Sequence, residues 1–439
     1  MSHFHAGDGK AADLAHPLVI NNTARQVTDK GFQQILQKEF VKVQRFIKKS
    51  KEDMLKSQHA EYITLHDLVR DYLSIKKIIV YGGYAINALL PKKYRLYDEY
   101  DMPDVDCMSY RALSHIKEIQ NILKMHGIPT TMKNGLHEGT YKLYYKHKVF
   151  LDITKINEKT HKRLLDLSEV DRKAFNITTS ITLAPIMLLK SNFYQELANP
   201  EDSMYRWEKV YQRMLIFAYI FPLPKPKTPI CKTPLNQSSL GTVASGIENV
   251  YHYALNVIRE HRYPIIGHAA ISILKGFNLY NDLNYCRRIN ADPFIDVIST
   301  NDENAITHFY KAMKRHPLIG GRIQMTRKTY MNEIVPERIN IHYDNGKRKI
   351  RIVRIFRTEP KCYSVMPSEN VPQESRDYTV GSYDTILYIL HRMYIMYQIY
   401  EAEKVVGVLK YIQEIEDMVA GLYLKKDGTR LSVKCAHIV

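Results

Sequence analysis

The stretch "VYGGYAINALLPKKYRLYDEYDMPDVDCMSY", from Val80 to Tyr110, combines two patterns that decide the fold of the chain. In the first, Gly82 and Gly83 directly follow an apolar run, "KKIIVY", and precede a helix-like segment, "YAINALL". Glycine lets the backbone approach a ligand, and the N–H groups at a helix N-terminus point at anions, so the pattern predicts a phosphate-binding turn. Alone, a Gly-Gly pair between a strand and a helix is most often only a turn.

The second pattern is the pair of acids Asp104 and Asp106, which a single valine separates. Because side chains alternate along a strand, both carboxylates share one face, with Cα atoms roughly 7 Å apart. Carboxylates placed in this way can hold one or two hard divalent cations, and magnesium keeps water and substrate phosphate among its ligands. An isolated Asp-x-Asp is usually a surface turn, so a metal site needs a further acid.

A third acid, Asp152, lies in "HKVFLDITKI", residues 147–156, where apolar residues alternate as in a half-buried strand. An acid in the middle of such a strand is costly to bury unless it is paired or binds a metal. Three acids meet the requirement of two-metal phosphoryl or nucleotidyl transfer, in which ions about 3.5 to 4 Å apart hold the attacking and leaving oxygens. The sequence therefore predicts a phosphate cradle beside a metal site.

The composition narrows the class of protein. The chain has 439 residues, 45% of them hydrophobic, which predicts two to three globular domains. A net charge of +17 is typical of a surface that binds a polyanion, although an AT-rich genome also inflates lysine and tyrosine, of which the chain has 32. The sequence begins with no leader-like segment and contains no apolar run long enough to cross a bilayer, so we expect a soluble protein that is not secreted.

The chain contains five cysteines: Cys107, Cys231, Cys286, Cys362 and Cys435. Their odd number, scattered positions and lack of CxxC spacing argue against a disulfide framework and against a zinc cluster. We therefore expect a reducing compartment.

Four segments follow one another along the chain. Residues 1–70 read as a polar tail and helices, among them a core-packing helix over residues 28–49. Residues 71–221 form a first α/β domain that carries the three acids. Residues 222–245 hold most of a Pro-rich run that excludes regular structure, and we interpret them as a connection. Residues 246–439 form a second domain.

The second domain repeats features of the first, as two copies of one α/β unit would. "YPIIGHAAISILKGF" (263–277) can be laid on "IVYGGYAINALLPKK" (79–93), and "YDTILYILHRMYIMYQIY" (383–400) resembles "APIMLLKSNFYQELA" (184–198). Chance similarity of two apolar α/β stretches is the alternative. Four pairs coincide in the first alignment: Gly267 with Gly82, Ala270 with Ala85, Ile271 with Ile86, and Leu274 with Leu89.

The copies differ at the positions that carry chemistry. The second copy keeps Asp292 and Asp296, but four residues of strand span roughly 13 Å, too far to share one metal easily. The first copy is therefore predicted to be active and the second degenerate. Three substitutions separate them: His268 in place of Gly83, Phe294 in place of Asp104, and His391 in place of Lys190.

The motifs "VYGG", "DVD" and "LDI" together resemble the DNA polymerase β-like nucleotidyltransferase superfamily. Within it, "GGYAINALL", "PDVD" and "YRWEKVYQR" look most like the catalytic subunit of poly(A) polymerases of the poxvirus and giant-virus group, over about residues 78–212. The resemblance implies an α/β (α+β) protein with two nucleotidyltransferase-like units, the second degenerate, after an N-terminal helical segment.

The resemblance also implies roles for single residues. Gly82 and Gly83 hold the ATP triphosphate, while Asp104 and Asp106 bind two ions of Mg²⁺ or Mn²⁺. Asp152 completes the metal site and helps to activate the RNA 3′-hydroxyl. Three basic residues neutralise phosphate: Lys190, with Arg206 and Lys209 as weaker candidates.

One departure from the superfamily is the long spacing between Gly83 and Asp104, which makes "KKYRLYDEYDM" loop out. The acids of this loop, Asp98, Glu99 and Asp101, are expected to be solvated surface residues. The role of the loop is open.

The implied function is template-independent transfer of AMP from ATP to an RNA 3′ end. Alternatives are a uridylyl- or CCA-adding enzyme, because no motif selects adenine, and a non-catalytic RNA-binding processivity protein, against which the intact trio of acids argues. Expected partners are the RNA 3′ end and ATP, with a homodimer or a processivity subunit possible, and no membrane. The expected location is the host cytoplasm, a viral factory or the virion.

Overall fold

The computed structural model describes residues 41–43, 45–46, 49, 61–97, 103–136, 138–223, 245–276, 294–300, 303–328, 331, 334–358, 362–424 and 434–437. Almost all of the helix expected over residues 28–49 and nearly all of the Pro-rich connection lie outside these residues, as do Asp98, Glu99, Asp101 and Asp292. Contacts divide the chain into two units, Met1–Thr64 and Leu65–Val439. The second of these holds both α/β copies.

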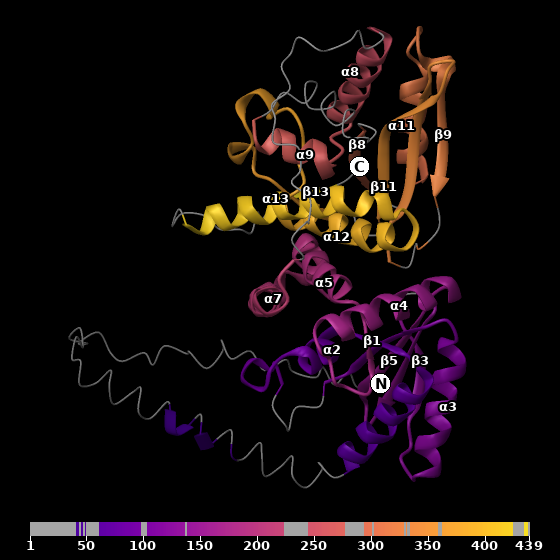
Figure 1. Cartoon of the computed structure of the whole chain (residues 1–439), viewed down its shortest axis with the longest axis vertical. Coiled ribbons are helices and arrows are strands. Elements are labelled where there is room, and N and C mark those ends of the chain that lie inside the picture. Colours follow the sequence, from indigo (N-terminus) through magenta and orange to yellow (C-terminus); the bar gives the residue numbers. More distant parts are fainter. Residues whose placement is uncertain are drawn as a thin grey trace, which may run out of the picture. The chain divides into compact units, whose positions relative to one another are not determined.

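The first copy is built on a six-stranded mixed sheet with the order β3-β4-β5-β2-β1-β6 (Figure 1). In it, β1 pairs antiparallel with β2 and parallel with β6, while β2 pairs parallel with β5. The strands are β1 (Ile79–Tyr81), β2 (Val105–Ser109), β3 (Thr131–Asn134), β4 (Thr140–Tyr145), β5 (Lys148–Lys155) and β6 (Thr182–Leu183).

Two helices of the first copy begin with a side chain bonded to their N-terminal N–H groups. The Asn157 side chain accepts a hydrogen bond from the backbone N–H of Lys159 and so caps α4. At α5, which follows Pro185, the carboxylate of Asp171 accepts from the N–H of Ile186 at 2.7 Å. The helices are α2 (Gly82–Leu89), α3 (Ala112–Met125), α4 (Glu158–Ala174), α5 (Ile186–Ala198), α6 (Pro200–Ser203) and α7 (Trp207–Ile220).

The second copy has the same strand order as the first, which confirms the duplication. Its five-stranded sheet runs β7-β8-β11-β10-β9, so its strands take the places of β1, β2, β5, β4 and β3 in turn. A parallel bridge between Ile265 and Val380 stands where β1 meets β6. The strands are β7 (Ile265–Ile266), β8 (Ile295–Thr300), β9 (Ile323–Lys328), β10 (Glu337–Asp344) and β11 (Lys349–Thr358).

The two copies also agree residue by residue at the glycine turn. Gly82 and Gly267 begin α2 and α9 with φ values of +68° and +64°, a region that favours glycine. In the register, Tyr81 faces Asp106 and Ile266 faces Asp296. The alignment of Gly267 with Gly82 is therefore correct.

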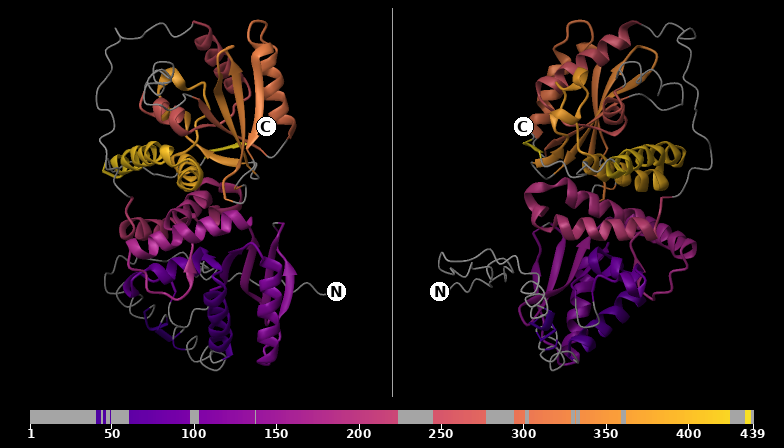
Figure 2. Two further views of the ribbon diagram at one scale, coloured as in Figure 1. Left: turned by 45° about the vertical axis from the view of Figure 1, so that its right-hand side comes forward. Right: turned by 90° about the vertical axis from the view of Figure 1, so that its left-hand side faces the viewer.

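Helices α5 and α12 pack against each other and join the two copies (Figures 1 and 2). The guanidinium of Arg392 donates to the side-chain oxygens of Asn192 and Gln195 at 2.7 and 2.8 Å. The rings of Tyr194 and His391 lie 4.9 Å apart. The helices of the second copy are α8 (Ser245–Glu260), α9 (Gly267–Leu274), α11 (Glu303–Lys314), α12 (Tyr383–Tyr400) and α13 (Val405–Leu424), and a separate antiparallel pair is formed by β12 (Cys362–Val365) and β13 (Lys434–His437).

The cysteines differ in state. Cys107 is a free, buried thiol, whereas Cys362 is disulfide-bonded. The spacing of the cysteines gave no sign of a disulfide, because pairing depends on the spatial distance between the Cα atoms and not on sequence intervals.

Among the described residues, no helix is long and apolar enough to span a membrane.

The glycine turn of the second copy gives a stability test. An alanine Cβ at Gly267 would lie 2.5 Å from Oδ2 of Asp296 in a backbone of φ +64°. Left-handed backbone costs about 1 to 2 kcal/mol, and overpacking typically adds about 1 to 3 kcal/mol. We expect Gly267→Ala to lower the midpoint of chemical denaturation clearly.

Gly127→Ala is the matched control, because Gly127 has φ +74° but nothing within 4 Å of the added Cβ. It should show only the backbone cost. Equal losses for the two variants would mean that the close approach to Asp296 is not a constraint.

Candidate active site

Four side chains form a row across neighbouring strands of the first sheet. Tyr81 on β1 is the register partner of Asp106 on β2, Asp106 of Asp152 on β5, and Asp152 of Lys142 on β4. Register partners in adjacent strands share a face of the sheet. The sheet therefore brings together two of the three predicted acids and adds a lysine that the sequence did not indicate.

Asp104 lies just before β2, exposed, and two residues from Asp106. Burial raises the pKa of Asp106 to about 7, with further contributions from the charges of Asp104 and Asp152. The three carboxylates thus interact electrostatically, as the sequence predicted. Such crowding of negative charge is relieved by a nearby cation.

The glycine turn lies directly against these acids. A Cβ at Gly82 would overlap the carboxylate of Asp106, with Cγ at 3.0 Å. A Cβ at Gly83 would overlap the hydroxyl of Tyr97, with Cζ at 3.3 Å. Gly82, with φ +68°, is therefore required for the close approach of Asp106, whereas the contact at Gly83 is with the far end of a side chain; the N-terminus of α2 lies beside the acids.

The ammonium of Lys142 forms an ion pair with Oδ2 of Asp152. Burial raises the pKa of Asp152, and Lys142 opposes that rise. The other carboxylate oxygen, Oδ1 of Asp152, is buried and accepts no hydrogen bond among the described residues. A buried acceptor without a donor is a position that a cation can satisfy.

The residues present fit the divalent cations that the fold implies, with one condition. No three His, Cys, Asp or Glu side chains within the described ranges converge into a ready-made metal cage. The crowded charges of Asp104, Asp106 and Asp152 and the buried acceptor of Asp152 nevertheless call for a cation. Because Lys142 already contacts Asp152, a metal ion there must share this carboxylate with the ammonium or displace it.

Lys190 is buried on α5. Its side chain on α5 is 3% exposed, and burial lowers its pKa while Glu416 on α13 opposes that effect. The neighbouring Tyr194 donates to the carboxylate of Glu416 at 3.1 Å. The charge that acts on Lys190 therefore comes from the second copy.

The two weaker candidates lie at the start of α7. Arg206 forms an ion pair with Glu196, an acid on α5 whose charge also raises the pKa of Asp106. Lys209 is exposed one turn further on. Arg206 is thus neutralised by an acid close to the site, and its role as a phosphate ligand stays a prediction.

Four residues near the site were missed by sequence reasoning: Lys142, Glu196, Tyr97 and Arg213. No local pattern indicated Lys142, because a register shift between Leu143 and Tyr144 places it opposite Asp152. Glu196 and Arg213 lie in the quoted stretches "APIMLLKSNFYQELA" and "YRWEKVYQR", and Tyr97 lies in the loop between Gly83 and Asp104, but the pattern of these stretches did not single them out.

The second copy replaces the third acid with a base. Arg354 on β11 is the register partner of Asp296, as Asp152 is of Asp106. Its guanidinium donates to both carboxylate oxygens of Asp296 at 2.7 and 2.8 Å, and to the hydroxyl of Tyr397 at 3.0 Å. Although burial lowers the pKa of Arg354, Asp296 raises it overall. The remaining acid is therefore neutralised by the protein itself.

The other substitutions complete this change. Phe294, in the place of Asp104, lies 4.5 Å from the guanidinium of Arg354 and 4.7 Å from that of Arg351. His268, in the place of Gly83, stacks its ring 4.8 Å from Tyr411. A phenyl ring cannot ligate a hard cation, so the second copy lacks the pair of carboxylates of the first, and its catalytic degeneracy stays a prediction.

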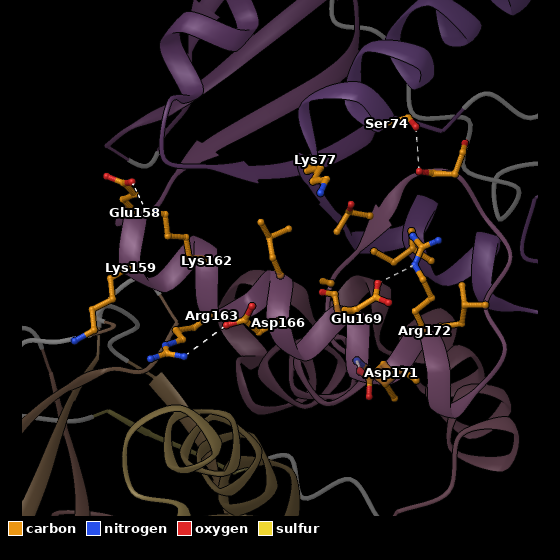
Figure 3. Close-up of a pocket in the computed structure, with 18 of the residues that line it drawn as sticks. Ser74, Lys77, Glu158, Lys159, Lys162, Arg163, Asp166, Glu169, Asp171 and Arg172 are labelled. Carbon is orange, nitrogen blue, oxygen red and sulfur yellow. Dashed lines mark hydrogen bonds and ion pairs between the residues drawn. The ribbon is translucent and has the colours of Figure 1, made fainter.

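A separate cleft of ≈ 1230 Å³ runs along α4 and contains none of the predicted site residues (Figure 3). Its charged side chains largely pair with one another, for example Lys162 with Glu158 at 2.8 Å and Arg163 with Asp166 at 3.6 Å. It therefore offers little excess charge to a polyanion.

The fold and the arrangement of the site resemble those of the polymerase β-like nucleotidyltransferases. A strand leads into a glycine-initiated helix, the next strand opens with Asp-x-Asp, and its parallel neighbour carries the third acid. Only the first copy keeps all of these elements.

Comparisons with known proteins specify the class further. Residues 67–203, which cover most of the first copy and all three acids, match the family model of the poly(A) polymerase catalytic subunit. The whole chain has the fold of the Megavirus polyadenylate synthase, whose crystal structure superposes with a TM-score of 0.70 at 18% sequence identity, covering 94% of this chain and 80% of that chain. No curated protein matches the sequence.

The buried ion pair between Asp296 and Arg354 in the second copy gives a test. Asp296→Ala leaves the guanidinium of Arg354 buried without its carboxylate, and breaking a buried ion pair costs about 3 to 5 kcal/mol. We expect a marked fall in denaturation midpoint, and a rate of nucleotide transfer by the folded protein close to wild type.

The double variant Asp296→Ala with Arg354→Met removes both charges and should recover much of the lost stability. A loss of rate comparable to that at Asp106, with the fold intact, would show that the second copy is catalytic.

Proposed function

We propose that the chain is a template-independent polynucleotide adenylyltransferase that transfers AMP from ATP to an RNA 3′-hydroxyl and releases pyrophosphate. The observation that carries the proposal is the grouping of Asp106 and Asp152 beside the glycine-initiated helix α2, within residues that match the poly(A) polymerase family. The second copy, with Arg354 in place of the third acid, lacks this grouping.

Asp104 and Asp106 are proposed to hold two ions of Mg²⁺ or Mn²⁺, with Asp152 as the third carboxylate. When bound, such ions stabilise the attacking and leaving oxygens of an in-line displacement. Carboxylate oxygens are the ligands that these hard cations prefer. The buried, unsatisfied oxygen of Asp152 supports this assignment.

The protein contributes positioning and charge neutralisation more than covalent chemistry. The backbone N–H groups at Gly82 and Gly83 are oriented to bind phosphate oxygens of ATP. Asp152 is the group proposed to accept the proton of the RNA hydroxyl. Lys142 holds this carboxylate in place and offsets its charge.

RNA is proposed to bind through the excess positive charge of the chain, +17 in total. Lys190, Arg206 and Lys209 stay candidates for phosphate contacts. A cytoplasmic or viral-factory location, and a second copy or a processivity subunit as partner, stay predictions, as do the boundaries 71–221 and 246–439 of the two copies. The second copy is proposed to act as a platform or interface.

Removing the first two acids tests the site. Asp104→Ala with Asp106→Ala should abolish AMP transfer while RNA binding persists, because the metal ligands are lost and the basic surface is not. Extension of a labelled RNA primer measures transfer, and filter binding measures RNA affinity.

The matched control replaces Asp67 and Asp71, two partly exposed acids of the helix that ends at Lys76, and should transfer AMP at the wild-type rate. Transfer of AMP by the Asp104/Asp106 double variant would show that these two acids are not the metal ligands.

Nucleotide choice tests the substrate. We expect incorporation of ATP at least tenfold more efficient than of UTP, GTP or CTP on an unstructured primer, a difference of about 1.4 kcal/mol. Equal use of UTP, or ordered use of CTP and ATP, would point to a uridylyl- or CCA-adding enzyme. No incorporation of any nucleotide, with RNA binding retained, would favour the processivity protein.

A further inference from the structure

The phosphate turn of the first copy is covered by a tyrosine. The hydroxyl of Tyr97 lies against Gly83, so close that a Cβ on this residue would overlap with it. Gly83 is the second residue of α2, whose N-terminus faces the acids. The hydroxyl therefore occupies space that the phosphate oxygens of a nucleotide need if they are to approach this backbone.

The segment that carries Tyr97 is fixed to α2 itself. The side-chain oxygen of Asn87 accepts hydrogen bonds from the backbone N–H groups of Leu96 at 2.7 Å and Tyr97 at 3.2 Å. A 3-10 helix, η1 (Lys92–Tyr94), connects the end of α2 to this point. These two hydrogen bonds hold the segment at Leu96 and Tyr97 against α2.

A cationic side chain lies over the ring of Tyr97. The guanidinium of Arg213, on α7, lies 5.4 Å from the ring centroid, within the range of a cation–π interaction. Among the described residues, no carboxylate lies within ion-pair distance of Arg213. Arg206, at the start of the same helix, differs in that it pairs with Glu196. Arg213 also lies beyond residues 67–203, which the family model matches.

We propose that Arg213 binds the triphosphate of ATP, and that Tyr97 holds it over the glycine turn until the nucleotide displaces the tyrosine hydroxyl. The proposal rests on the proposed function, because it assumes that ATP binds at Gly82 and Gly83. Guanidinium groups suit phosphate, since their planar N–H donors can form paired, charge-assisted hydrogen bonds. The ring supplies a weak partner for the cation and leaves it available for a stronger one.

The charges of the site explain why such a cation is needed. Asp104, Asp106 and Asp152 bring negative charge to the same end of the sheet, and Lys142 is engaged with Asp152. The triphosphate adds several negative charges beside these acids. Arg213 lies over the ring of Tyr97, whose hydroxyl in turn lies against Gly83.

Nucleotide binding without RNA tests the proposal. The affinities of ATP and AMP are measured by competition with a fluorescent ATP analogue, at fixed magnesium concentration, for wild type, Arg213→Gln, Arg213→Lys, Tyr97→Phe and Tyr97→Ala. Arg213→Gln should weaken ATP about tenfold, equivalent to about 1.4 kcal/mol, and leave AMP unchanged. Arg213→Lys should restore part of the loss.

The two tyrosine variants separate ring from hydroxyl. Tyr97→Phe keeps the ring and removes the group that must be displaced, so ATP should bind as well as to wild type or more tightly. Tyr97→Ala removes the support of Arg213 and should weaken ATP by a smaller factor than Arg213→Gln. In primer extension these changes should appear in the KM for ATP more than in kcat.

Two variants serve as matched controls. Tyr94→Ala removes an aromatic ring from the same segment, whose cation partner is Lys93, and Arg163→Gln removes an arginine paired with Asp166. Both should bind ATP as wild type does, and circular dichroism verifies that every variant is folded. Wild-type ATP affinity in Arg213→Gln, or equal losses for ATP and AMP, would overturn the proposal. If wild type itself incorporates no nucleotide, the proposed function fails instead.

Discussion

The structure depends on a carboxylate packed against the first residue of a helix. In each copy an aspartate of the second strand, Asp106 or Asp296, touches a glycine that begins the neighbouring helix with positive φ. This contact places negative charge at the positive end of a helix, where it is favourable, but also inside a sheet face that is largely removed from water. A cation must therefore accompany the aspartate, and its identity decides what each copy can do.

The two copies solve this requirement differently. In the first, the cation of the protein is Lys142, a single ammonium on a flexible stem, attached to a strand outside the acid cluster. Such a group can yield or share its carboxylate, so the cluster stays open to metal ions. In the second, Arg354 replaces the third acid and holds Asp296 through two hydrogen bonds in a fully packed setting. Two sheets of the same strand order thus carry different sites: one can exchange cations, and the other has a cation that is part of the chain.

Much of this organisation was predictable from local pattern. The alternation of apolar and polar residues in β2 and β5 indicated strands that carry Asp106 and Asp152 on their polar faces. The repeated glycine turn at Gly267 indicated the second copy, which the strand order confirms. The disulfide at Cys362 and the burial of Lys190 were not predictable, because both depend on segments that are distant in sequence. Lys190 looked like one polar position on an apolar helix, and only packing placed it near the second copy.

The sequence by itself indicated the acids, the glycine turn, the duplication and the substitutions in the second copy. Each of these features can be recognised from the residue types within a short stretch of sequence. Tertiary structure alone decided which cations meet those acids. Counting back from the turn at Lys146 would place Lys142 opposite Leu151, but a bulge between Leu143 and Tyr144 shifts the register by one residue. Side chains alternate with a period of two, so this single shift turns the lysine onto Asp152. No local pattern encodes such a choice, since it arises from the fit of whole strands.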